Sequence, residues 1–162
     1  MTSNHINPFF FWHSSSPFSN WHPAIFKDDE GRTFYNSEQY MMYHKALLFN
    51  DKVAMENIIK TTNPKDCKAW GRKVKNFDSK TWDAVSQEVV YQGCLYKFQQ
   101  NKNLKSYLMK SGNRLLAEAS PYDKFWGIGL NAFNARRTPV EEWPGKNWLG
   151  TALMRVRDTL TE

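Results

Sequence analysis

The chain has 162 residues and a mass of 19.1 kDa, the size of one ordinary domain that buries most of its apolar surface. Hydrophobic residues make up 41% and charged residues 23%, a balance that is typical of a folded protein and excludes a disordered one. The net charge of +6 and the sequence pI near 9.3 favour an anionic partner, although a merely solvated basic surface explains them equally well.

Cysteine and histidine usage argues against a metal centre. The two cysteines, Cys67 and Cys94, form no CxxC pair and are expected to be reduced, and the four histidines show neither HxH nor HExxH spacing. No apolar stretch reaches the roughly 18 residues that a membrane span requires, and the N-terminus lacks the pattern of a signal peptide. We therefore expect a soluble, cytoplasmic protein that uses no metal or other cofactor and contacts no membrane.

The first 60 residues predict strands followed by helices. Aromatic and β-branched runs interrupted by an acidic, glycine-bearing turn favour short strands. Asn, Ser and Asp offer N-caps before the helical patterns. In chain order, we expect a strand at 6–12, a hairpin joining 24–26 to 32–35 through a turn at 28–31, a helix from Asn36 or Ser37 to about Phe49, and a helix from Asp51 to about Lys60.

The remainder predicts further helices, one strand and a long loop. Proline after a capping Asn, and glycine after a helical run, mark a start and an end. We expect a helix from Asn63 to about Lys73, a long helix from Asp78 or Ser79 with an apolar stripe of Trp82, Val85, Val89, Leu95 and Phe98, a helix ending at Gly112, a strand at 114–119, a structured loop at 120–145 and a helix at 147–160. The fold class is α+β, mainly α-helical, with a small sheet in a single domain spanning 1–162.

Glu38 and Lys45 form the first candidate site. They are seven residues apart in one helix, so they project from the same face, about 10 Å apart along the axis. Met41 and Met42 lie on or near that face, so both charges are desolvated if it is buried. A desolvated carboxylate and amine suit acid–base or nucleophilic chemistry. Alternatively, Glu38 complements the helix dipole and Lys45 extends into water.

A second candidate is WPGKNWLG at 143–150, a glycine-bearing loop that leads into a helix. Free backbone N–H groups at a helix start, together with Lys146, would make an anion site. The segment lacks the GxxxxGK[ST] spacing of a P-loop. Asn147 acting as a simple N-cap is the alternative, and that role needs no ligand.

A third candidate is SPYDKFWGIGL at 120–130. Gly127 and Gly129 would let the backbone approach a ligand closely, and Trp126 offers a face for stacking. Asp123 could hold a water molecule or a sugar hydroxyl. The WGIG motif alone is weakly specific.

In combination these segments are far more specific than any one of them. The ordered set resembles the NADAR family, which includes the YbiA-like N-glycosidases, over about residues 7–160. The matching segments are FSN at 18–20, SEQYMMYHKA at 37–46, NPKDCKAWGRKVKNF at 63–77, KTWDAV at 80–85, LLAEASPYDKFWGIGL at 115–130 and GKNWLGTALMRVRD at 145–158.

This resemblance implies hydrolysis of the N-glycosidic bond at C1 of a phosphorylated ribose, without a cofactor. The substrates it implies are ADP-ribose on guanine, including ADP-ribosylated nucleic acid, and the ribosylamino-pyrimidine intermediates of riboflavin biosynthesis. The insert between Gly129 and Trp143, with Arg136 and Arg137, varies within the family. The resemblance implies that Glu38 and Lys45 are the functional residues, that Trp82 and Trp126 are the pocket tryptophans, and that Gly145, Lys146 and Asn147 form the last binding motif. To these we add Asp123 as a catalytic candidate that orients hydroxyls. Asn20, Gly127 and Gly129 are added as candidates for substrate binding.

The chemistry suits these residue types. Cleavage of a ribosyl C–N bond develops oxocarbenium character that a carboxylate such as Glu38 stabilises, and Glu38 could also activate water. Lys45 could protonate the departing base or form a Schiff base with the opened ribose. Two further hypotheses remain: a module that binds ADP-ribose or a nucleotide without cleaving it, and a binder of single-stranded nucleic acid.

Overall fold

The computed structural model describes residues 7–161, which fall into two compact units. Residues 20–102 form one unit, called here the central unit. Residues up to 19 and from 103 onward form the other, called here the terminal unit. Each unit is described by itself.

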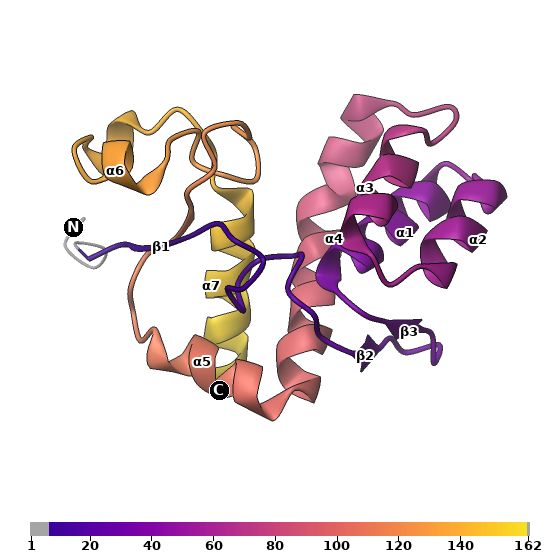
Figure 1. Ribbon diagram of the computed structural model, residues 1–162, viewed down its shortest axis with the longest axis horizontal. Helices are drawn as coiled ribbons and strands as arrows, with labels where there is room; N and C mark the ends of the chain where they lie inside the picture. Colours follow the sequence, from indigo (N-terminus) through magenta and orange to yellow (C-terminus); the bar gives the residue numbers. More distant parts are fainter. Residues whose placement is uncertain (1–6, 162) are drawn as a thin grey trace. The chain divides into compact units, whose positions relative to one another are not determined.

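The elements follow the predicted order closely (Figure 1). Among residues 7–161 no helix is both long and apolar enough to cross a membrane. The elements are β1 (Phe9–Phe11), β2 (Phe26–Lys27), β3 (Thr33–Phe34), α1 (Ser37–Leu48), α2 (Lys52–Lys60), α3 (Pro64–Arg72), α4 (Ser79–Gln100), α5 (Lys102–Lys110), β4 (Leu116–Glu118), α6 (Ala132–Ala135), η2 (Val140–Glu142) and α7 (Trp148–Thr161).

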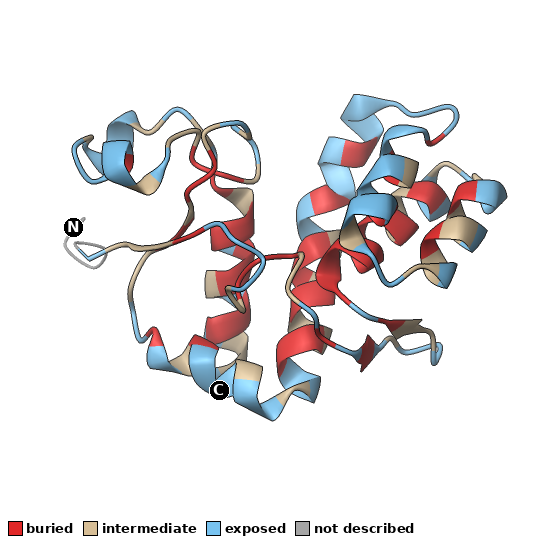
Figure 2. Cartoon of the chain, in the orientation of Figure 1, coloured by how far each residue is buried: buried red, intermediate tan, exposed pale blue. Residues whose placement is uncertain are grey.

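Helix α1 is the core of the central unit. It packs against α2, α3 and α4, and eight of its twelve residues are buried (Figure 2). A side chain in place of Gly71 on α3 would collide with Met42, and one in place of Gly93 on α4 would collide with the ring of Tyr40. Glycine at these two positions therefore lets both helices approach α1 closely.

Hydrogen bonds fix the start of α1. The Asn36 side chain caps the helix by accepting from the Gln39 N–H at 2.8 Å. The buried Gln39 side chain accepts from the Tyr35 N–H at 2.7 Å and donates to the Ile58 and Thr61 carbonyls at 2.9 and 2.7 Å. These contacts join the first turn of α1 to the end of α2.

The terminal unit is built on β1, which pairs in parallel with β4 so that Phe9 lies opposite Leu116. Helix α7 packs against β4. One face of β1 carries a cluster in which the ring of Phe18 meets Phe9, Phe11 and Tyr107 edge-on, with centroids 5.4, 5.5 and 5.1 Å apart. Edge-to-face contacts of this kind stabilise aromatic cores.

Most expectations are confirmed, including the α+β, mainly helical class, the hairpin β2–β3 and the caps Asn36, Asp51, Asn63 and Asp78. Gly112 follows α5 with a φ of 62°. The predicted strand at 6–12 is β1, and Ile6 lies outside the described residues. Instead of one small sheet there are two two-stranded sheets, and the predicted loop at 120–145 contains the short helices α6 and η2.

The predicted apolar stripe on α4 is wrong in part. Val85 is exposed, whereas Ser86 and Lys97 are buried together with Trp82, Val90 and other residues of the inner face. The inner face therefore includes polar side chains, which a pattern based on apolar residues alone does not select.

The burial of Lys97 predicts a specific pH dependence of stability. Burial lowers the pKa of Lys97 from 10.5 to about 8, so between these values the unfolded chain binds more protons than the folded one. Stability contributed by this group therefore rises with pH, by about 2 kcal/mol between pH 8 and pH 10. Urea unfolding of the wild type against Lys97→Met should show this gain only in the wild type. Equal pH slopes in the two proteins would contradict the prediction.

Candidate active site

Glu38 lies in the first turn of α1, and the residue is only 8% exposed. The Glu38 N–H donates to the Asn20 carbonyl at 2.9 Å, and the Asn20 side-chain oxygen accepts from the Ser37 hydroxyl at 2.8 Å. Asn20, expected to bind substrate, thus already has a structural function: it fixes the turn that carries Glu38.

Lys45 lies two turns further along α1 and shares the electrostatic environment of Glu38. Burial lowers its pKa, the Glu38 carboxylate raises it and the Arg72 guanidinium lowers it again. The Lys45 ammonium lies 4.4 Å from the centre of the Phe77 ring. The net result is a half-buried amine whose neutral form is more accessible than that of an ordinary lysine. Sequence analysis did not identify Phe77 or Arg72, although both fall within a segment that carries the family resemblance.

Two more residues, Cys67 and Trp82, lie on helices that pack against α1. Burial, with the negative charge of Glu38 as the next contribution, raises the pKa of the Cys67 thiol to about 12, so this cysteine is not a nucleophile. Trp82 is buried in the first turn of α4, and α4 packs against α1. The central unit therefore carries Glu38, Lys45, Asn20 and Trp82.

The expected backbone anion site at 145–149 is wrong. Its five N–H groups donate to carbonyls of segment 124–128 at 2.7 to 3.2 Å, so the chain itself occupies them. The alternative, Asn147 as an N-cap, is confirmed for its backbone and wrong for its side chain. Asn147 directly precedes α7, and its carbonyl accepts from the Thr151 N–H at 3.0 Å. It has a φ of 56°, and its buried side chain accepts from the Glu118 N–H at 3.1 Å and donates to the Leu116 carbonyl at 2.8 Å. Asn147 joins the start of α7 to β4.

The glycines of the WGIG segment serve the same packing. A Cβ on Gly127 would lie 2.9 Å from the Asp123 carbonyl oxygen, and Gly129 has a φ of 77°. One on Gly145 would collide with the Gly127 carbonyl oxygen. Gly127 and Gly145 are required because backbone approaches backbone, and Gly129 is required because its φ is positive, in each case independently of any ligand.

The side chains of this region are arranged around two tryptophans. One carboxylate oxygen of Asp123 accepts from the Phe125 and Trp126 N–H groups, each at 2.9 Å. The Trp126 and Trp148 rings meet edge-on at 5.5 Å, and the Lys146 ammonium lies 5.0 Å from the Phe125 ring. Asp123, Trp126 and Lys146 are therefore brought together within the terminal unit, and their expected roles toward substrate stay predictions.

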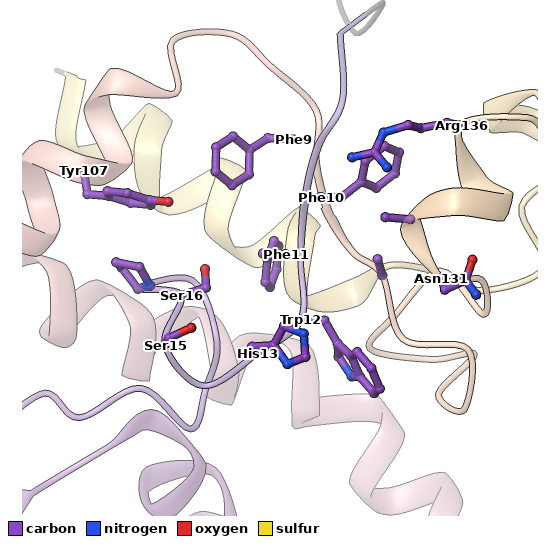
Figure 3. A pocket seen from close by; sticks show the side chains of 13 residues that line it. Phe9, Phe10, Phe11, Trp12, His13, Ser15, Ser16, Tyr107, Asn131 and Arg136 are labelled. Atoms are coloured by element: carbon purple, nitrogen blue, oxygen red, sulfur yellow. The ribbon is translucent and has the colours of Figure 1, made fainter.

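The terminal unit also contains a cavity of about 640 Å³ that sequence analysis did not predict. The aromatic run at 9–12 lines it together with His13, Asn131 and Arg136 (Figure 3). Two sequence features could have indicated the cavity: the dense aromatic run at 9–12 and the arginines of the insert. The aromatic run was interpreted only as a strand. Among residues 7–161 no three His, Cys, Asp or Glu side chains are grouped so as to hold a metal ion.

Comparison with known proteins extends this picture over both units. The family model described as NADAR domain matches residues 9–161. N-glycosidase R617 of Acanthamoeba polyphaga mimivirus is 43% identical over 87% of this chain and 85% of its own length. N-glycosidase Npun_R5314 of Nostoc punctiforme is 30% identical over 92% and 88%. The NMR structure of the E. coli protein YbiA superposes with a TM-score of 0.77 at 26% identity, over 99% of this chain and 90% of that one.

These similarities define the class of protein, an enzyme that hydrolyses N-glycosyl bonds. Within that class, the chain belongs to the NADAR family, because the family model matches almost its whole length.

The structural use of Asn147 predicts a loss of stability on its removal. Asn147→Ala breaks two buried hydrogen bonds to the backbone of β4 and should lower the free energy of unfolding by about 2–4 kcal/mol. Exposed Asn113→Ala is the control and should change it by less than about 0.5 kcal/mol. Chemical denaturation measures both. A cost for Asn147→Ala no larger than that of the control would show that these bonds do not stabilise the fold.

Proposed function

We propose that this enzyme removes ADP-ribose from guanine, with Glu38 and Lys45 as its reactive groups. One observation carries the assignment: a buried carboxylate and an amine with a lowered pKa lie two turns apart on the same helix. Family membership supports the reaction class, and the chemistry of the two side chains supports their roles.

Glu38 is suited to the carbon side of the reaction. As the C1–N bond of the ribose breaks, its electron pair leaves with the base and positive charge develops at C1. A desolvated carboxylate stabilises that charge, and it can accept a proton from the water that adds to C1. The hydrogen bonds around Asn20 hold Glu38 in place, so little reorganisation is needed.

Lys45 is suited to either of two steps. As an ammonium it can donate a proton to the departing base nitrogen. As a neutral amine it can attack C1 of the ring-opened sugar, release the base and form an imine, which water then hydrolyses to the free aldehyde. Its lowered pKa supports the second route, because a larger fraction of the amine is neutral near pH 7.

The charge distribution supports a phosphate-bearing substrate. Residues 60–80 contribute a net +5 of the total +6 of the chain, and all of the charged side chains in that segment are exposed. One of them, Arg72, acts electrostatically on Lys45. Such a surface attracts phosphates, including those of an ADP-ribosylated nucleic-acid strand. The cations are Lys60, Lys65, Lys68, Arg72, Lys73, Lys75 and Lys80, and the acids are Asp66 and Asp78.

Glu38→Gln tests the reaction directly. It keeps the size of the side chain and removes the charge, so we expect turnover to fall by about 10²- to 10⁴-fold. Glu56→Gln, at an exposed position of α2, should retain wild-type turnover. Base release from guanine-ADP-ribosylated DNA and from a ribosylamino-pyrimidine phosphate is followed by chromatography. Release only from the second substrate would identify a metabolite hydrolase, and no release from either would contradict the proposal.

The lowered pKa of Lys45 predicts the direction of a pH profile. If Lys45 forms the imine, borohydride trapping of the adduct should increase with pH, with a midpoint below the ordinary lysine value of 10.5. Arg72→Gln removes a charge that lowers this pKa, so the midpoint should move upward, whereas Lys73→Gln should leave it unchanged. Mass spectrometry of the trapped protein measures the profile. An adduct that is absent at every pH would assign Lys45 to proton donation instead.

A further inference from the structure

We propose that the cavity of the terminal unit binds a nucleotide, with the base on Trp12 and a phosphate at Arg136. This inference rests on the proposed function, because an ADP-ribosyl substrate carries an adenosine diphosphate group that needs a site of its own. The cavity volume of about 640 Å³ falls within the range of roughly 300–1,000 Å³ that small-molecule sites occupy.

Trp12 is the most exposed Phe, Tyr or Trp ring among the lining residues. Phe9, Phe11 and Tyr107 pack edge-on around Phe18, although Tyr107 stays 38% exposed. Trp12 lies outside this cluster and is 43% exposed. Among residues 7–161, its ring contacts the rings of His13 and Tyr122, at 5.4 and 6.0 Å, and both contacts are tilted, so neither ring covers it face to face. A base can therefore stack on the indole.

The Arg136 guanidinium is held against an aromatic ring. It lies 5.1 Å over the ring of Phe10, and Trp143 is a further aromatic neighbour of that ring at 5.8 Å. Hydrogen bonds from the Trp143 indole N–H to the Ala135 and Thr138 carbonyls hold Trp143 in turn. Within residues 7–161 the Arg136 guanidinium meets no carboxylate and no hydrogen-bond acceptor. Figure 3 shows it beside Phe10. A planar, oriented guanidinium suits bidentate binding of phosphate.

The rest of the lining favours the same ligand. His13, Ser15, Ser16 and Asn131 supply polar groups, and none of the described residues that line the cavity is acidic, so these residues do not repel an anion. Trp12 directly follows β1, and Ala119, another lining residue, directly follows β4, so the carboxyl ends of these paired parallel strands border the cavity.

Binding of ADP, measured by titration calorimetry on the full chain, tests the site. Arg136→Ala should weaken ADP binding at least tenfold and change adenosine binding little. Trp12→Ala should weaken the binding of both ADP and adenosine. Arg137→Ala is the matched control, because this neighbour has the same charge, stacks on Phe133 at 4.3 Å and does not line the cavity. It should bind ADP like the wild type.

Three results would overturn the site: no ADP binding by the wild type, wild-type affinity in Arg136→Ala, or equal weakening in Arg136→Ala and Arg137→Ala. Unchanged thermal unfolding of the Trp12, Arg136 and Arg137 variants, expected because all three side chains are exposed, separates lost binding from lost folding. Glu38→Gln should bind ADP normally. A wild type that binds ADP in this way yet cleaves no glycoside would refute the proposed function alone, whereas cleavage without an Arg136-dependent ADP affinity would refute only the site.

Discussion

The burial of the polar first turn of α1 is the constraint on which the central unit depends. A helix start exposes backbone N–H groups, and burying them without partners costs free energy. Here Asn36 caps the turn, Gln39 ties it to the end of α2, and the Asn20 carbonyl accepts from the Glu38 N–H. Because these bonds satisfy the backbone, the Glu38 carboxylate can be held away from water without destabilising the helix.

The same burial makes the helix chemically useful. Helical spacing places Lys45 on the face that carries Glu38, and packing buries Glu38 and half-buries Lys45. The apolar ring of Phe77 contacts the amine while Arg72 opposes its protonation. Glu38 acts in the opposite direction, so the balance between burial, one anion and one cation sets the pKa of Lys45. A lysine on a solvated helix face would keep its ordinary pKa.

Much of the fold could be predicted from local sequence signals. Features that depend on contacts between residues far apart in the chain could not be predicted. Asn36, Asp51 and Asn63 were identifiable because a cap acts on residues next to it. Glu38 and Lys45 could be paired because both lie on one helix. The burial of Lys97 could not be predicted, because a lysine in a helix is normally assigned to the solvent-exposed face. The cavity escaped prediction because its walls come from β1, α5 and the insert at 131–136.

Asn147 shows why a motif can suggest the wrong ligand. Glycine, lysine and asparagine before a helix resemble a phosphate loop because that loop needs flexible backbone and free amides. In this chain the glycines allow segment 124–128 to approach, and its carbonyls take every amide from 145 to 149. The N–H groups of the motif are thus hydrogen-bonded within the chain, and the Asn147 side chain joins α7 to β4. In the same unit, Arg136 and Lys146 are cations whose guanidinium and ammonium groups rest on aromatic rings.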